Sequence, residues 1–469
     1  MRQKLILWAM LVALFLAAAL RSEGDATESA DDFVAWTKSA AIHFDRLDWR
    51  GPAGEKLGVL DGALARKRVV FLGEPDHYIH EKYAFRLIMI EHLVKKGWRH
   101  IGMEMGRSDG QRLDRYLQTG DETFLDRMAA YGCEEYKRSD RDDEPSGLFA
   151  RVKERLEASR AAFWAEERRF AAALLEINRS REKGTPPVRF FGFDVDLVPD
   201  CGYGDLEAIL AAADSPTPLA DSLHGALQRI AGETREEEVE RLTRVVEKVQ
   251  KQKAALVELL GEAGSELFSR TLSSLRDSFA ITARVFHTAS PVELMDALAQ
   301  RETVMFRHFD EYMEGLGQGE KVILMGHNLH LSKDSEWLSG GRLGEPVALW
   351  RTIGTHVAES LPGQAYSIWL LYDHGQNSGY LSADGAVDIP SKPDSVEHLL
   401  ARAGTNFLLP LEGTLGDGRY LNEARNFTQN GEYGSGIIPR QADAIFFVET
   451  VSALRIDESA RPGIRKGRP

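Results

Sequence analysis

Cysteine is scarce in this chain, because only Cys133 and Cys201 occur among its 469 residues. Neither stands in a recognisable Cys-His motif, so a catalytic thiol is disfavoured. Two cysteines in an exported chain can pair, but the sequence does not give the distance between their Cα atoms. A Cys133–Cys201 disulfide therefore stays open at this point.

Positive charge is also in the minority. The 58 Lys and Arg residues are outnumbered by 72 Asp and Glu, which gives a formal charge of −14 and a pI near 5.5. No stripe of Lys or Arg offsets this balance, and nucleic-acid binding normally needs a basic face. We therefore expect no nucleic-acid partner. Beyond the N-terminus, no apolar run is long enough to span a bilayer.

The N-terminus has the pattern of a targeting segment. Arg2 and Lys4 precede sixteen apolar or small residues at 5–20, and Ala17-Ala18-Ala19 offers a cleavage site. This pattern predicts an exported protein, periplasmic or extracellular. Because Arg21 follows the apolar run, attachment to a membrane through residues 5–20 is the alternative.

Short apolar runs and long amphipathic stretches alternate along the rest of the chain, and 43% of all residues are hydrophobic. This alternation predicts an α/β fold with a central, mainly parallel sheet and helical insertions. The expected strands are 68–72, 100–103, 188–193, 321–325, 366–372 and 444–448. The Gly- and Asn-rich stretch 405–433 is expected to form loops. We divide the chain into a signal peptide or anchor at 1–21, a linker at 22–30, one domain at 31–455 with insertions at about 111–183 and 205–313, and a flexible tail at 456–469.

Polar side chains follow three of the expected strands. Glu74 and His77 come after the first strand, Glu104 ends the second, and His327 and His330 come after a later one. Open α/β folds gather their chemistry at the carboxyl ends of parallel strands. We therefore expect these three distant segments to form one active site.

The residue types suggest general acid–base chemistry. We expect His77 to be the general base and Glu74 or Glu104 to orient it. His327 and His330 would donate protons to a developing oxyanion and to a departing alkoxide. Arg86, nine residues past His77, would stabilise negative charge.

Three other interpretations stay open from the residues alone. Two histidines and two carboxylates can bind zinc or manganese, which would make a metal-dependent hydrolase. The segment Gly106-Arg107-Ser108-Asp109-Gly110 matches the nucleophile elbow of serine esterases, with Ser108 as nucleophile. A non-catalytic protein that binds haem or another ligand on a related fold is the third.

Several motifs together resemble the erythromycin esterase family. They are Gly73-Glu74-x-x-His77, Glu81 and Arg86, the strand ending at Glu104, Leu113-Asp114-Arg115-Tyr116, Phe191-Gly192-Phe193-Asp194, Arg301-Glu302-x-x-Met305, Gly326-His327-Asn328-Leu329-His330, and Asp443-Ala444-Ile445-Phe446-Phe447. The resemblance spans roughly residues 69–448. It implies an α/β fold with helical insertions, and hydrolysis of a carboxylic ester or macrolactone by an activated water without a covalent intermediate, metal or cofactor.

The resemblance also implies roles for single residues. His77 matches the family's proposed base, and Glu74, Glu104, Arg86, His327 and His330 match its other pocket positions. Tyr78, Asp194 and Asn328 are expected to bind substrate. Tyr78 replaces a small residue that usually follows the base, and His308 stands where many members carry Asn. An export signal sets this chain apart from the cytoplasmic resistance enzymes of the family. We therefore expect a small-molecule ester or lactone as substrate, without specifying which one. The oligomeric state stays open.

Overall fold

A computed structural model describes most of the chain, namely residues 28–126, 128, 165–196, 199, 201–213, 217–228, 230, 232–287, 290–345, 347–378, 386–412 and 419–454. The expected signal or anchor segment, most of the linker, Cys133 and the expected tail lie outside these residues, so the Cys133–Cys201 pairing does too. Among the helices within the described ranges, none combines the length and apolarity needed to cross a membrane.

The central sheet is mixed and mostly parallel, which confirms the predicted α/β fold. Its order is β1-β10-β13-β8-β2-β5-β3-β4, and every neighbouring pair from β13 to β4 is parallel. The strands β1, β10 and β9 pair antiparallel. The bounds are β1 Ile42–His43, β2 Val69–Glu74, β3 His100–Gly106, β4 Arg189–Asp194, β5 Val322–His327, β8 Ala365–Asn377, β9 Val387–Ile389, β10 Asn406–Pro410 and β13 Ala444–Val451.

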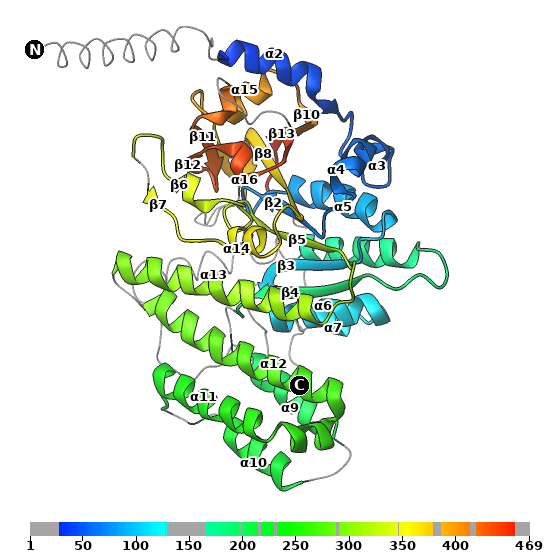
Figure 1. The fold of residues 1–469 in the computed structure, drawn as a ribbon, viewed down its shortest axis with the longest axis vertical. Helices are drawn as coiled ribbons and strands as arrows, with labels where there is room; N and C mark the ends of the chain where they lie inside the picture. Colours follow the sequence, from blue (N-terminus) through cyan, green and yellow to red (C-terminus); the bar gives the residue numbers. More distant parts are fainter. Residues whose placement is uncertain are drawn as a thin grey trace, which may run out of the picture.

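Helices cover both faces of this sheet, as expected when parallel strands are buried on both sides (Figure 1). On one face, α5 (Glu81–Lys95), α6 (Arg107–Thr119) and helical residues 165–179 pack on alternate residues of β2, β3 and β8. On the other face, α13 (Pro291–Glu314) and α14 (Ile353–Ser360) pack on β2, β4 and β5. Farther along, α2 (Ala30–Ala40) and α15 (Val396–Ala401) pack on β8, β10 and β13.

Four helices form a separate lobe with its own apolar core, at the bottom of Figure 1. They are α9 (Cys201–Ala211), α10 (Pro218–Leu227), α11 (Arg235–Lys251) and α12 (Lys253–His287). They fall largely within the stretch 205–313, where helices are expected. Short elements complete the described part: α3 Ala53–Lys56, η1 Leu57–Leu60, α4 Asp61–Leu64, α7 Thr123–Asp126, η3 Ser335–Trp337, η4 Tyr420–Asn422 and α16 Ile438–Gln441.

The prediction of loops at 405–433 is wrong for much of that stretch. It contains β10, whose Phe407, Leu408 and Leu409 are fully buried, and β11 (Arg425–Gln429). A turn at Asn430 and Gly431, with φ of 50° and 75°, leads into β12 (Glu432–Gly436). An Asn-Gly pair between strands is a strong hairpin signal, because both turn residues need positive φ. With β6 (Leu338–Gly340) and β7 (Val347–Ala348), this hairpin forms a second sheet of four strands.

Candidate active site

The three polar segments predicted from sequence meet at the carboxyl ends of β2, β5 and β3, which are neighbours in the sheet. Glu74 lies opposite His327 at the ends of β2 and β5. The ring centroids of His77 and His327 are 5.3 Å apart, and those of His327 and His330 are 6.2 Å apart. The parallel pairing of β2 and β5 therefore brings His327 into one cluster with Pro75 and His77, which lie about 250 positions earlier in the sequence.

His77 is held by a buried carboxylate. Its Nδ1 lies 2.6 Å from Oε1 of Glu74, which is buried at the end of β2. Arg86 NH2 contacts the other carboxylate oxygen at 2.8 Å, and Lys82 Nζ lies 3.5 Å from Oε1. Burial alone would raise the pKa of Glu74, but Arg86, Lys82 and His77 together lower it to about 2. The ionised carboxylate accepts the Nδ1 proton of His77, which leaves Nε2 as the atom able to take a proton from water.

Lys82 is a site residue that the sequence reasoning missed. Its Nζ donates to the backbone carbonyl of His77 at 2.5 Å, and its side chain is buried with the pKa lowered by that burial. Lys82 and Arg86 are four residues apart on α5, so they share a helix face. The sequence signal for Lys82 is this four-residue spacing from Arg86, shortly after the Glu-x-x-His motif. Lys82 therefore fixes the loop that carries His77.

His327 is neutral and bound to backbone on both sides of its ring. Its Nε2 lies 3.1 Å from the Pro75 carbonyl, and its Nδ1 accepts from the Leu329 amide at 3.3 Å. This pattern places the proton on Nε2. Burial, and then the neighbouring His77 and His330, lower the pKa of His327 to about 3. A neutral ring here adds no positive charge beside His77.

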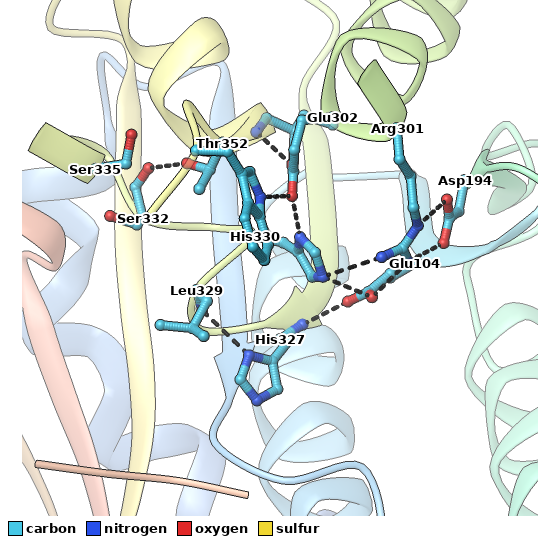
Figure 2. Close-up of polar contacts among 12 residues, drawn as sticks. Glu104, Asp194, Arg301, Glu302, His327, Leu329, His330, Ser332, Ser335 and Thr352 are labelled. Carbon is cyan, nitrogen blue, oxygen red and sulfur yellow. Dashed lines mark hydrogen bonds and ion pairs between the residues drawn. The ribbon is translucent and has the colours of Figure 1, made fainter. Parts of the chain in front are cut away.

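His330 is the opposite case, an imidazolium between two carboxylates (Figure 2). Its Nδ1 pairs with Glu302 Oε1, and its Nε2 lies 3.2 Å from Glu104 Oε1. Burial would lower the pKa of His330, but Glu104 and Glu302 raise it to about 10. His330 is therefore a fixed positive charge at neutral pH.

Glu104 joins the two histidines to a partly buried arginine, Arg301. It accepts from the His327 backbone amide at 2.7 Å and from Arg301 NH2 at 3.1 Å, in addition to His330. Burial acts to raise its pKa, but His330, His77 and Arg301 bring it well below the usual value. Glu104 thus orients His330 and Arg301, whereas the carboxylate in contact with His77 is Glu74.

Arg301 and Glu302 are adjacent residues on α13. Both belong to a sequence motif of the family resemblance, but neither was predicted as a site residue. Arg301 Nε donates to Asp194 Oδ1 at 2.9 Å and NH2 contacts Oδ2, so Asp194 holds the guanidinium in a two-point contact. Glu302 also accepts from Trp350 Nε1 at 2.6 Å and from the Ile353 amide at 2.8 Å. Both residues act on His330 from the same helix (Figure 2).

Comparison with known proteins fits this geometry. The sequence profile described as Erythromycin esterase matches residues 93–451, which is more than half of the chain. This chain belongs to the erythromycin esterase family. No curated protein sequence matches the chain.

Solved structures show the same fold. A Bacillus cereus protein aligns with a TM-score of 0.68 at 18% identity, over 92% of this chain and 100% of its own. A succinoglycan biosynthesis protein aligns with a TM-score of 0.63 at 16% identity, over 91% and 99%. A mutant of erythromycin esterase EreC in its open conformation aligns with a TM-score of 0.61 at 18% identity, over 88% and 98%. At these identities the likeness concerns the fold alone.

All three positions expected to bind substrate in this erythromycin esterase family member are buried in the fold: Asp194, which is paired with Arg301, and Asn328 and Tyr78. Asn328 is fully buried, its Nδ2 donates to the Leu370 carbonyl at 3.0 Å, and its amide donates to the Glu74 carbonyl at 2.7 Å. Gly73 makes room for it, because a Cβ there would lie 2.2 Å from Asn328 Oδ1. Tyr78 is 3% exposed and packs in the core under β2. In this conformation all three side chains therefore contact protein.

His308, the other departure from the family pattern, lies on α13 and is also buried. Burial, together with Arg107 and Arg307, lowers the pKa of His308 well below its usual value. It is therefore a neutral interior residue and not part of the cluster around His77.

Ser108 does not have the surroundings of a serine nucleophile. It lies in the first turn of α6, directly after β3, but its Oγ donates to Asp196 Oδ2 at 3.0 Å. A carboxylate on the hydroxyl proton replaces the histidine that activates a serine in a hydrolase triad. The glycines of the motif serve packing, because a Cβ on Gly110 would lie 1.9 Å from the Gly192 amide nitrogen.

The metal interpretation gains no support from the arrangement of donors. Within the described ranges, no group of three or more His, Cys, Asp or Glu side chains is placed to hold a metal ion. Glu74 and Glu104 are instead paired with Arg86, Lys82 and Arg301, so the site carboxylates already have cationic partners.

The charge on His330 predicts a pH dependence of stability. Its pKa is about 10 in the folded protein and near 6.5 in an unfolded chain. The folded state therefore binds the extra proton, so the stabilisation is complete below about pH 6.5 and is lost as pH rises toward 10. We expect the difference in unfolding free energy between wild type and Glu302→Gln, measured by urea denaturation, to shrink between pH 7 and 10. A difference that stays constant over this range would contradict the raised pKa.

Proposed function

We propose that this protein hydrolyses a carboxylic ester or lactone by direct attack of a water that His77 deprotonates. The observation that carries the proposal is the contact of 2.6 Å between His77 Nδ1 and the ionised Glu74, which leaves Nε2 as the proton acceptor. Membership of the erythromycin esterase family supports a hydrolase acting on a small molecule.

The reaction needs one proton carrier. Water gives a proton to His77 Nε2 while its oxygen bonds to the acyl carbon, and the carbonyl oxygen becomes negative. The bond from the acyl carbon to the alkoxy oxygen then breaks, and the proton on Nε2 passes to that oxygen. Glu74 stabilises the imidazolium formed in between, and the products are a carboxylic acid and an alcohol. No covalent bond to the protein is required.

The oxyanion is expected beside Arg301 NH1. That nitrogen lies 3.5 Å from His330 Nε2, whose single hydrogen already points to Glu104. Arg301 is therefore the direct donor to the oxyanion, and the positive charge of His330 acts on it at short range without a hydrogen bond of its own. One such donor is typically worth roughly 2.7 to 4 kcal/mol in the transition state.

Arg86 and His327 have indirect roles in this proposal. Arg86 acts through Glu74, which it keeps ionised and fixed in place. His327 donates to the Pro75 carbonyl and so holds the backbone just before His77. From the sequence, by contrast, both side chains were expected to stabilise negative charge directly.

The substrate is tested by a panel of macrolactones, simpler lactones and carboxylic esters, followed by mass spectrometry. We expect wild type to add the mass of one water to at least one lactone, and dialysis against EDTA to leave that turnover in place. A purified protein with a Soret band and no turnover of any panel member would favour a ligand-binding protein instead.

Ser108 offers a test of the competing mechanism. Because its hydroxyl is bound to Asp196, we expect Ser108→Ala to keep turnover within about threefold of wild type. The measurement is kcat/KM, together with labelling by a fluorophosphonate probe. Labelling of Ser108, with loss of turnover in the variant at unchanged Tm, would establish a serine esterase.

A further inference from the structure

The hairpin β11–β12 reaches the catalytic cluster at its turn. The backbone amide of Asn430 donates to the Pro75 carbonyl at 2.7 Å, and the same carbonyl is the partner of His327 Nε2. The residue before Asn430 is Gln429, the last residue of β11. Gln429 thus directly precedes Asn430, whose backbone amide contacts the Pro75 carbonyl beside the cluster.

Gln429 is buried without using its amide. It is 5% exposed, and neither Oε1 nor Nε2 has a hydrogen-bond partner among the described residues. A buried polar group without a partner is costly, so such groups are rare and need an explanation. The neighbouring residue differs, because the backbone amide of Thr428 donates to a carboxylate oxygen of Glu397 at 2.7 Å.

Gln429 is expected on the face of β11 that packs on the central sheet. Phe427, two residues earlier and so on the same face, has its ring centroid 5.7 Å from that of Trp369. Trp369 lies opposite Gly73, one residue before Glu74, in the sheet. Strand alternation therefore turns Gln429 toward the same sheet, next to the turn whose Asn430 amide meets the Pro75 carbonyl after β2.

Two further polar atoms without partners lie beside Gly73. Trp369 Nε1 and Asn328 Oδ1 have no hydrogen-bond partner among the described residues. A Cβ on Gly73 would lie 2.2 Å from Asn328 Oδ1 and 3.2 Å from Trp369 Cδ1, the atom bonded to Nε1. Together with Gln429 they offer two donor groups and two acceptor groups, all uncharged.

We propose that Gln429, Trp369 and Asn328 form a polar subsite that binds a hydroxyl group of the ester beside the reacting carbon. A hydroxyl both donates and accepts, and an ionic group would be disfavoured in a place that offers no charge. Because these atoms are shielded from solvent here, admission of the ester requires the turn of β11–β12 to move away from Pro75. This inference rests on the proposed ester hydrolysis.

The test compares ethyl 3-hydroxybutyrate with ethyl butyrate. We expect wild type to prefer the hydroxyester, and Gln429→Leu to reduce this preference in kcat/KM about threefold to tenfold, mainly through KM, as for the loss of one neutral hydrogen bond. The Tm of Gln429→Leu should not fall, because no bond within the protein is lost. An equal loss on both esters, or a lowered Tm, would overturn the subsite and indicate a structural role.

Gln441 is the matched control, because it is also a buried glutamine with an unpartnered Nε2 but its Oε1 is paired. Its Oε1 accepts from Ser332 Oγ and from the Asp334 amide. Gln441→Leu should lower the Tm and leave the ratio between the esters unchanged. If wild type hydrolyses neither ester, the hydrolase proposal fails for these substrates, and calorimetric binding of the same two esters decides the subsite alone. Equal or undetectable binding of both to wild type would overturn it.

Discussion

Replacing His77 with alanine is expected to lower kcat by about 10² to 10⁴ while leaving the fold intact, because general-base assistance typically contributes that much. His77 lies on the loop after β2 with its side chain 31% exposed, so its removal creates little buried cavity. The measurement is kcat with an ester that wild type hydrolyses, together with the Tm of both proteins.

His80→Ala is the control for this variant. His80 lies on the same loop, and its Nδ1 contacts Glu166 at 2.7 Å instead of the catalytic cluster. We expect it to keep most of the wild-type kcat. Residual activity of His77→Ala above about a tenth of wild type would refute His77 as the base.

Replacing Arg86 with methionine is expected to give the largest loss of stability, about 3 to 5 kcal/mol, because it leaves the buried Glu74 carboxylate without its closest cation. Arg86 and Glu74 side chains are 1% and 2% exposed, so water cannot replace the lost partner. Turnover should fall as well, since Glu74 then no longer has a fixed position next to His77.

Adding Glu74→Gln to Arg86→Met removes the carboxylate that has lost its closest cation. We expect the double variant to regain most of the unfolding free energy, measured by urea denaturation, but not turnover, because the neutral amide cannot stabilise the imidazolium of His77. If Arg86→Met costs less than about 1 kcal/mol, or the double variant is no more stable, the ion pair is not the feature that organises Glu74.

The parallel strands could be predicted from sequence because each is a short, mostly apolar run. All six expected runs correspond to strands of the central sheet: β2, β3, β4, β5, β8 and β13. The stretch 405–433 was misread because its Gly and Asn content suggested loops. There the Asn430-Gly431 turn and the buried run of β10 are the decisive local signals.

The residues at strand ends could also be predicted, since parallel strands carry them to a common edge. Arg301 and Glu302 could not, because the rotation of their helix toward the site depends on packing against the sheet. For Lys82 the four-residue spacing from Arg86 on α5 was the only signal. Gln429 reaches the site only through the β11–β12 hairpin. The contact is made by the second sheet, so it cannot be predicted from the spacing of residues in the sequence.

Chemical rescue of His77→Ala by imidazole tests the central claim most directly. If the ring of His77 only carries a proton, free imidazole should restore turnover of His77→Ala in a saturable way, and restore little in a His77→Ala/Glu74→Gln variant that lacks the carboxylate. A His77→Ala protein whose turnover does not respond to imidazole, although the same protein still binds the ester, would contradict the role of His77 as the base.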